Sequence, residues 1–194
     1  DAGTLYDVQL VGPTRIRAEF HSIQVTGEIF RYTFTSFVVG TYNVSVRLKG
    51  VHLSGSPSVI EIAPNIANAA RCSIIGDGAS FGTAGIAATL TLFARDSFGN
   101  DIPYGGDVFL ADITNPTFSR TIVVPADQND GSYRLAFASS ISGPHILSIT
   151  LGGKDVFGSP FSVDVQAGAL DLSVTGIMFE MEAKAGDEHE IVVE

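Results

Sequence analysis

Cysteine, lysine and charge are all scarce in this chain of 194 residues. Cys72 is the single cysteine, so no disulfide can form within the chain and cysteine thiolates cannot build a metal site. Only 16% of the residues are charged, against roughly 25% in an average soluble domain. The lysines are Lys49, Lys154 and Lys184. Ser, Thr, Asn and Gly must therefore cover much of the surface.

The charge balance and the hydropathy argue against two classes of partner. The net charge is −10 at pH 7, which disfavours binding to nucleic acid or to an anionic membrane surface. No apolar run approaches the roughly 20 residues of a membrane-spanning helix, and no signal-peptide pattern follows Asp1. Solubility explains the acidic excess most simply. We therefore expect no nucleic-acid partner and no direct membrane insertion in this segment.

What the sequence does have is an internal repeat. Residues 143–151 and 158–165 match residues 40–48 and 55–62, and the offset between the copies is 103 residues in both cases. Each copy places Gly-Ser-Pro at the end of a loop between two alternating apolar segments. A period of this length is the size of one small β-domain.

The whole chain alternates apolar and polar residues at period two, and no window favours a helix. Between residues 67 and 167 this pattern predicts seven strands, which we letter A to G. They span residues 72–76, 88–94, 108–113, 118–124, 132–137, 143–151 and 161–165. The count predicts an all-β protein of tandem immunoglobulin-like sandwiches, each with seven antiparallel strands.

The repeat divides the chain into three parts. Residues 1–64 hold strands C to G of a first unit, residues 67–167 a complete unit, and residues 168–194 strands A and B of a third. A sandwich without strands A and B exposes part of its core and leaves an open edge. We therefore expect a segment of a longer array, in which residues 168–194 of a neighbouring copy or of the same chain complete the 1–64 piece.

At this point the repeat resembles the filamin-type immunoglobulin-like repeat, also called the filamin/ABP280 repeat. The resemblance is carried by D-G-S-Y at 130–133, by the strand that begins at Gly143 and by G-S-P-F-S-V-D-V at 158–165. A-R-D-S-F-G-N at 94–100 is similar to the family's turn between strands B and C. The aromatic residue of strand F is His145 here, whereas Tyr42 keeps it in the first unit.

The resemblance implies an interaction surface beside strands C and D, where a partner peptide adds a strand. An unpaired edge offers main-chain hydrogen bonds, and alternate side chains give specificity. The residues at these positions are Val108, Phe109, Leu110, Ala111, Arg120, Thr121, Ile122 and Val123. The alternative is an edge that is solvated or covered by the adjacent repeat. The resemblance does not extend to actin crosslinking, because this segment contains no actin-binding domain.

One modification motif stands in the first unit. Asn43-Val44-Ser45 is an N-glycosylation sequon. Asn43 alternates with Tyr42 and Val44, which we expect to face the core, so its side chain is predicted to point outward. It would carry a glycan in a secreted protein; the alternative is that the motif occurs by chance.

Two clusters of oxygen-bearing residues raise the question of calcium. Asp96, Asn100 and Asp101 lie close together in the sequence, as do Asp127, Asn129 and Asp130. Such residues more often cap turns through local hydrogen bonds, so we predict no metal site. The four histidines share no ligand spacing, and His145 is expected to be a hydrogen-bonded core residue. We predict no catalytic residue and no cofactor.

Three functions remain to be compared. The first is a non-enzymatic structural segment, acting as spacer, filament or scaffold through its tandem repeats and associating with protein partners or with neighbouring repeats. The second is an adhesion or signalling module that captures a partner peptide on the C–D edge. An enzyme is the third, and no convergent polar set supports it. Low charge and the sequon favour an extracellular or cell-surface location, while the family resemblance favours the cytoskeleton. Of the two, we slightly favour an extracellular or cell-surface location.

Overall fold

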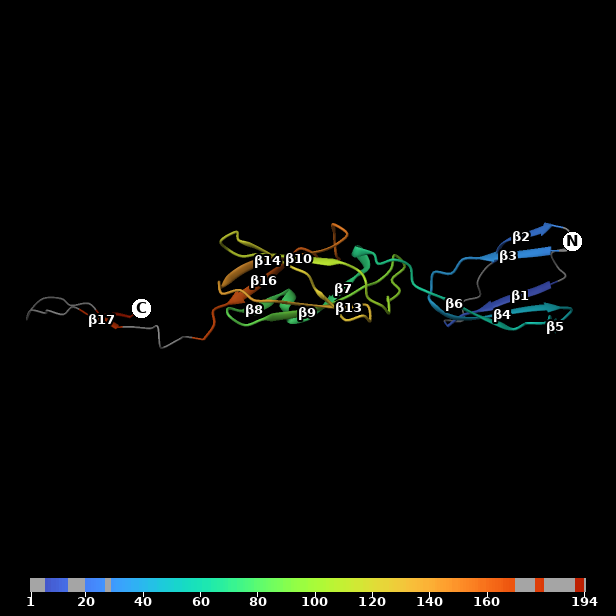
Figure 1. Ribbon diagram of the computed structural model, residues 1–194, viewed down its shortest axis with the longest axis horizontal. Helices are drawn as coiled ribbons and strands as arrows, with labels where there is room; N and C mark the ends of the chain where they lie inside the picture. The colour runs from blue at the N-terminus through green and yellow to red at the C-terminus, as the bar shows by residue number, and fades with distance from the viewer. Residues whose placement is uncertain (1–5, 14–19, 27–28, 170–176, 180–190, 194) are drawn as a thin grey trace, which may run out of the picture.

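The computed structural model describes residues 6–13, 20–26, 29–169, 177–179 and 191–193. Figure 1 shows two β-units arranged end to end, the first built from β1 to β6 and the second from β7 to β16. The described helical elements are short 3-10 turns, at Ala69–Arg71 and Asp77–Ala79. The all-β prediction is therefore confirmed.

The second repeat is a sandwich of two sheets. One sheet has the order β11-β10-β14-β16-β8, with β15 on β14, and the other has the order β12-β13-β9-β7. The strands of the first sheet are β8 (Phe81–Thr83), β10 (Phe109–Thr114), β11 (Arg120–Val123), β14 (Gly143–Leu151), β15 (Lys154–Asp155) and β16 (Phe161–Gln166). Those of the second are β7 (Ser73–Ile75), β9 (Ala88–Phe93), β12 (Ala126–Asp127) and β13 (Ser132–Phe137).

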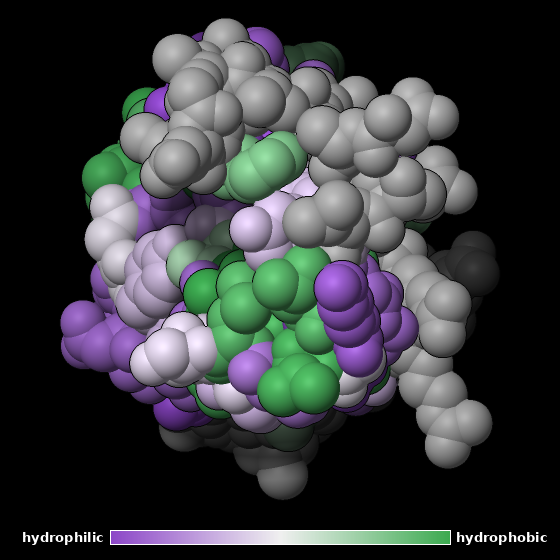
Figure 2. Space-filling model, turned by 90° about the vertical axis from the view of Figure 1, so that its right-hand side faces the viewer, coloured by the Kyte–Doolittle hydropathy of each residue, from purple (hydrophilic) through white to green (hydrophobic). Residues whose placement is uncertain are grey.

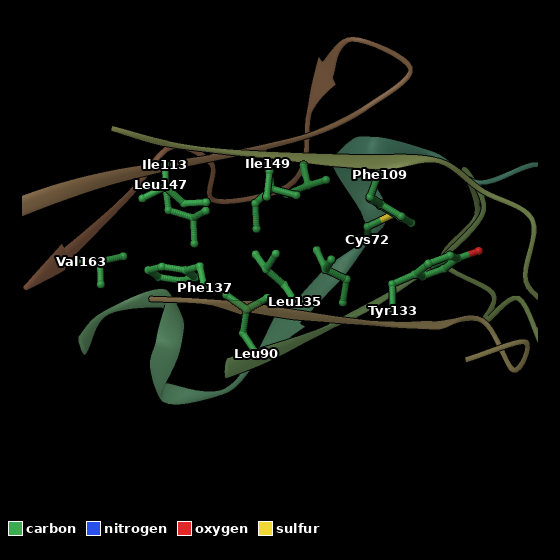
Figure 3. Close-up of a cluster of buried hydrophobic side chains, with 14 of the residues drawn as sticks. Cys72, Leu90, Phe109, Ile113, Tyr133, Leu135, Phe137, Leu147, Ile149 and Val163 are labelled. Atoms are coloured by element: carbon green, nitrogen blue, oxygen red, sulfur yellow. The ribbon is translucent and has the colours of Figure 1, made fainter. Parts of the chain in front are cut away.

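The core of this repeat lies between the two sheets. Alternate residues of the longer strands point inward, as the period-two pattern predicts; these strands are β9, β10, β13, β14 and β16. Figure 3 shows Leu90 and Leu135 from one sheet facing Leu147 and Ile149 from the other. All four side chains are buried. Phe109 packs on Tyr133 at the end of the core, with ring centroids 4.7 Å apart.

Two strands change sheets, which the simple seven-strand prediction does not anticipate. Strand A divides into β7 and β8, and β8 pairs in parallel with β16 at Val165↔Gly82. The crossing segment runs against β9 so closely that a Cβ on Gly78 would lie 2.6 Å from the carbonyl oxygen of Thr89. Residues 76–80, between β7 and β8, thus form the crossover.

Strand D divides in the same way. β11 pairs with β10, whereas β12 pairs with β13 in the other sheet. Pro125 lies between the two pieces. Proline lacks the N–H that a continuing ladder needs, so the strand changes partner there.

The first repeat copies one sheet of the second. Its strands are β1 (Tyr6–Val11), β2 (Phe20–Thr26), β3 (Ile29–Phe34), β4 (Gly40–Leu48), β5 (Val51–His52) and β6 (Ser58–Ile62). Tyr6 pairs with Leu48 as Phe109 pairs with Leu151, so the register is the same at an offset of 103 residues. In the first repeat β2 pairs with β3, as β12 pairs with β13 in the second.

The Gly-Ser-Pro motif has the same structural role in both repeats. Ser56 Oγ accepts the N–H of Val46 at 2.8 Å, and Ser159 Oγ accepts the N–H of Ile149 at 2.9 Å. The preceding glycines have φ values of +82° and +87°, which a side chain would strain. The motif therefore fastens the loop before the last strand to the middle of the long strand β4 or β14.

Beyond the second repeat, β17 (Ile177–Phe179) pairs antiparallel with β18 (Ile191–Val193). The assignment of residues 168–194 to strands A and B of a third unit stays a prediction. The sequence match of residues 174–176 to strand A lies outside the described residues.

Candidate functional site: the outer edge of the second repeat

The structure brings the two predicted site segments together in one sheet. Ala111 pairs with Val123, and Thr114 pairs with Arg120. Because β11 occupies the outer edge of β10 over this stretch, the free edge of the sheet belongs to β11. Strand C is thus already paired with the chain's own strand D, and a partner strand would have to pair with β11.

The predicted site residues divide between two faces. Phe109 and Ala111 point into the core and are buried. Val108 and Leu110 are exposed on the outer face, and so are Ile122, at 67%, and Val124, at 62%. Since Ala111 pairs with Val123, Leu110 and Val124 are neighbours on that face. Four apolar side chains therefore form an exposed patch over β10 and β11.

A single ion pair borders this patch. The guanidinium of Arg120 contacts the carboxylate of Asp112 across the two strands. The side chain of Arg120 is largely exposed, so the pair contributes at most about 1 kcal/mol. It serves to align β11 on β10 rather than to stabilise the fold.

Behind β11 lies a cavity of about 280 Å³, which sequence analysis did not predict. It opens between β11 and the residues after β13. Its apolar wall includes Ile113, Val123 and Phe137, and its polar end is formed by Ser139 and His145. Thr121 and Val123 line the cavity, so β11 itself forms one of its walls.

His145 is buried at this polar end, as expected of a hydrogen-bonded core histidine. Its Nε2 lies 2.8 Å from Ser139 Oγ and its Nδ1 lies 2.9 Å from the carbonyl oxygen of Gly143. In the first repeat the longer Tyr42 takes this position, and its hydroxyl donates to the carbonyl of Val38 at 2.8 Å. The replacement of an aromatic by histidine is the sequence signal that could have pointed to the cavity.

The turn that enters β10 is held by hydrogen bonds to two side chains. The N–H of Asp107 donates to the Tyr133 hydroxyl at 3.0 Å, and the N–H of Gly106 donates to Asp127 at 2.8 Å. Burial raises the pKa of Asp107, the Tyr133 hydroxyl opposes this shift, and the nearby charge of Asp127 adds to it. Burial also raises the pKa of Tyr133. These groups position β10 and offer no nucleophile.

The oxygen-rich turns use their side chains on their own backbone. Asp127 Oδ1 accepts the N–H of Asn129, and Asp130 Oδ1 accepts both the hydroxyl and the N–H of Ser132. The Ser132 hydroxyl, and then its N–H, lower the pKa of Asp130. Within the described ranges, no three His, Cys, Asp or Glu side chains gather in a way that could hold a metal.

Two other features bear on chemistry. Burial raises the pKa of the Cys72 thiol, so this side chain stays protonated inside the core. In the part of the chain that the structure describes, no helix is long and apolar enough to cross a membrane.

Asn43 is exposed in the middle of β4, with the outward orientation that the alternation predicts. It pairs with Val11 of β1 and with Val59 of β6. Both valines are exposed as well. The sequon therefore lies between two uncovered apolar side chains.

The fold and the site define an immunoglobulin-like sandwich of the kind that serves as a structural or protein-interaction repeat. Residues 66–162 match the family model of the Filamin/ABP280 repeat. The chain belongs to this family, whose fold is non-enzymatic.

Curated relatives agree with this assignment. The chain is 31% identical to Filamin-C of Rattus norvegicus over 145 residues, which is 74% of this chain and 5% of the relative. It is 34% identical to the tripartite motif-containing protein 3 of the same organism over 88 residues, or 45% of this chain and 12% of the relative. The chain thus spans only a small part of the proteins it matches.

Solved structures of two bacterial proteins show the same fold. The Escherichia coli adhesin FdeC is similar over 91% of this chain and 56% of its own, with a TM-score of 0.62 and 16% identity. Yersinia pseudotuberculosis InvD is similar over 97% of this chain and 58% of its own, with a TM-score of 0.56 and 20% identity. At this identity the likeness concerns the fold alone.

Proposed function

We propose that this chain is a spacer and scaffold segment, which sets the distance and direction between parts of a longer protein. The observation that carries the proposal is the end-to-end order of two repeats of the same register (Figure 1). The connector between them is short and bonded: the N–H of Asn68 donates to the carbonyl of Arg95 at 2.7 Å. A segment built in this way holds its neighbours at a fixed distance and direction rather than catalysing a reaction.

The test is to exchange the second repeat within the full-length protein. A spacer tolerates replacement of residues 67–167 by an unrelated repeat of equal length, but not their deletion. If equal-length replacement abolishes function as completely as deletion does, the spacer proposal is wrong.

A second function is favoured by the apolar patch over β10 and β11. We propose that the free edge of β11 captures an extended partner segment by strand addition, with Ile122 and Val124 contacting its side chains. The uncovered edge and the cavity behind it support this reading. An exposed apolar strand edge that stays unpaired promotes aggregation, so we expect a partner segment to pair with it.

Capture is tested by pulldown with the whole chain carrying Ile122→Pro or Ile122→Lys. Proline removes the main-chain donor of Ile122, while lysine keeps the backbone and changes only the patch. Strand addition predicts that both variants lose the partner, whereas Lys154→Ala on the exposed strand β15 keeps it. Retained binding in both Ile122 variants would overturn the proposal.

We also propose that the β17–β18 pair of a neighbouring copy supplies strands A and B to the first repeat. Val8, Val44 and Val46 are only half-buried, although their counterparts Ala111, Leu147 and Ile149 are fully buried. Figure 2 views the molecule from the first-repeat end and shows apolar atoms gathered there. The open core supports the idea that further strands belong on it.

Light scattering over a wide concentration range tests this completion. Completion by a second copy predicts a concentration-dependent series of oligomers. A chain that stays monomeric at every concentration would contradict it.

A further inference from the structure

The turn between β9 and β10 of the second repeat contacts the first repeat through main-chain groups. The side-chain amide of Asn100 donates to the carbonyl oxygen of Phe37 at 2.9 Å. The oxygen of the same amide accepts the N–H of Val39 at 3.4 Å. One side chain therefore binds a donor and an acceptor of the loop between β3 and β4.

The neighbouring Asp96 holds the connector. Its Oδ2 accepts the N–H of Asn65 at 3.1 Å and also the Asn100 amide at 2.9 Å. Its Oδ1 accepts the N–H groups of Phe98 and Asn100. Asp96 is buried, and its carboxylate is fully used by these four donors. The turn and the connector thus form one hydrogen-bonded unit.

An aromatic contact accompanies the polar ones. The rings of Phe37 and Phe98 pack with centroids 4.8 Å apart at an interplanar angle of 41°. A cavity of about 320 Å³ lies beside them, lined by residues of both repeats and of the connector. The contact therefore crosses from one repeat to the other at more than one point.

We propose that the turn of residues 95–101 is a docking surface for the preceding repeat, and that it fixes the angle between neighbouring repeats. Its partner is the exit end of another filamin-type repeat, recognised through the backbone of the loop between strands E and F. This proposal does not depend on whether the chain acts as a spacer or captures a partner on β11.

Because the docking surface binds main-chain groups, it does not depend on the side chains of the repeat that it binds. The counterparts of Phe37 and Val39 in the second repeat are Ser140 and Ser142, and both keep their main-chain groups. A following repeat with the same turn could therefore be held in the same way. The aromatic contact has no such counterpart, because Ser140 replaces Phe37. Adjacent junctions should share an orientation but differ in stiffness.

The experiment measures residual dipolar couplings of the ¹⁵N-labelled 194-residue chain. Docking predicts that both repeats share one alignment tensor in the wild type. In Asn100→Asp the amide donor is replaced by a charge beside Asp96, and the common tensor should be lost. Asp101→Asn is the matched control, because Asp101 lies in the same turn but contacts only Arg95, in an exposed ion pair.

Amide exchange supplies a second readout at single residues. In Asn100→Asp the N–H of Val39 should exchange about tenfold faster, the effect of losing one hydrogen bond. The N–H of Asn68 bonds to the carbonyl of Arg95 and not to Asn100, so it should keep its rate. If the two repeats of the wild-type chain had different alignment tensors, that result alone would overturn the proposal, even if a variant failed to fold. An Asn100→Asp chain with unchanged tensor and exchange would overturn it as well.

Discussion

His145 of the second repeat occupies the position that Tyr42 holds in the first, and each side chain bonds the serine six residues before it. His145 Nε2 lies 2.8 Å from Ser139 Oγ, and the Tyr42 hydroxyl lies 2.7 Å from Ser36 Oγ. Tyr42 also reaches the carbonyl of Val38, which anchors the loop before β4. The shorter histidine, together with Ser139, forms the polar end of the cavity behind β11.

His145→Tyr should destabilise the second repeat. Asn115 stands where the first repeat has Gly12, and a Cβ on Gly12 would overlap the ring of Tyr42, so a tyrosine placed like Tyr42 would meet the side chain of Asn115. We expect the free energy of unfolding of the second repeat to fall by about 1–3 kcal/mol, as for other overpacked sites. Urea denaturation followed by residue-resolved NMR measures this change. Tyr42→His is the mirror variant and should destabilise the first repeat, because it loses the bond to Val38; an unchanged stability of His145→Tyr would show that the loop at Asn115 can move aside for the ring.

The crossover of strand A gives a second prediction. Gly78→Ala places a Cβ 2.6 Å from the carbonyl oxygen of Thr89, so β9 or the crossover must move. We expect a loss of about 1–3 kcal/mol in the free energy of unfolding, as for other overpacked sites. Gly82→Ala is the control, since its Cβ would meet Val165 at an ordinary 3.4 Å. Equal stabilities of the two variants would mean that the crossover is not tightly packed.

The sequence predicted the sandwich because its alternation says which residues face the core. Tyr42, Leu135 and Leu147 are all inward, as their positions in the pattern required. Alternation does not say which strand lies alongside, so the switch of strand D at Pro125 and the crossover at Gly78 were not predicted. The docking turn was missed for a different reason. Asn100 binds main-chain groups of the first repeat. Because every residue carries a main chain, no pattern of side chains in the sequence marks such a contact.

Asn43 carries a prediction about modification. Expression of the chain through a secretory pathway should add an N-linked glycan at Asn43, because the side chain is exposed and its sequon is intact. The glycan would cover Val11 and Val59 on either side. Mass spectrometry before and after enzymatic deglycosylation measures the occupancy, and Asn43→Gln is the control. An unmodified chain would mean that folding of β4 into the sheet precludes transfer.

The final prediction concerns acid and the connector. Burial of Asp96 favours its neutral form, but the hydrogen bonds from Asn100, Asn65 and Phe98 outweigh this effect, so its pKa lies below the ordinary value of 3.8. A carboxylate with a depressed pKa contributes stability that is fully present above that ordinary value. The contribution is lost as the pH falls through the lower pKa of the folded state. Asp107, whose pKa is raised, acts in the opposite direction.

We therefore expect exchange of the Asn65 amide to accelerate, beyond the intrinsic effect of pH, as the pH drops from 3.8 toward the folded pKa of Asp96. Asp96→Asn should remove this acid dependence, because an amide does not titrate in this range, and it should weaken the connector at every pH. Amide exchange of Asn65 and Asn68, measured in the same samples, separates the connector from the body of the repeat. If Asn65 in the wild type followed only the intrinsic pH profile, the Asp96 carboxylate would not be what holds the connector against the turn.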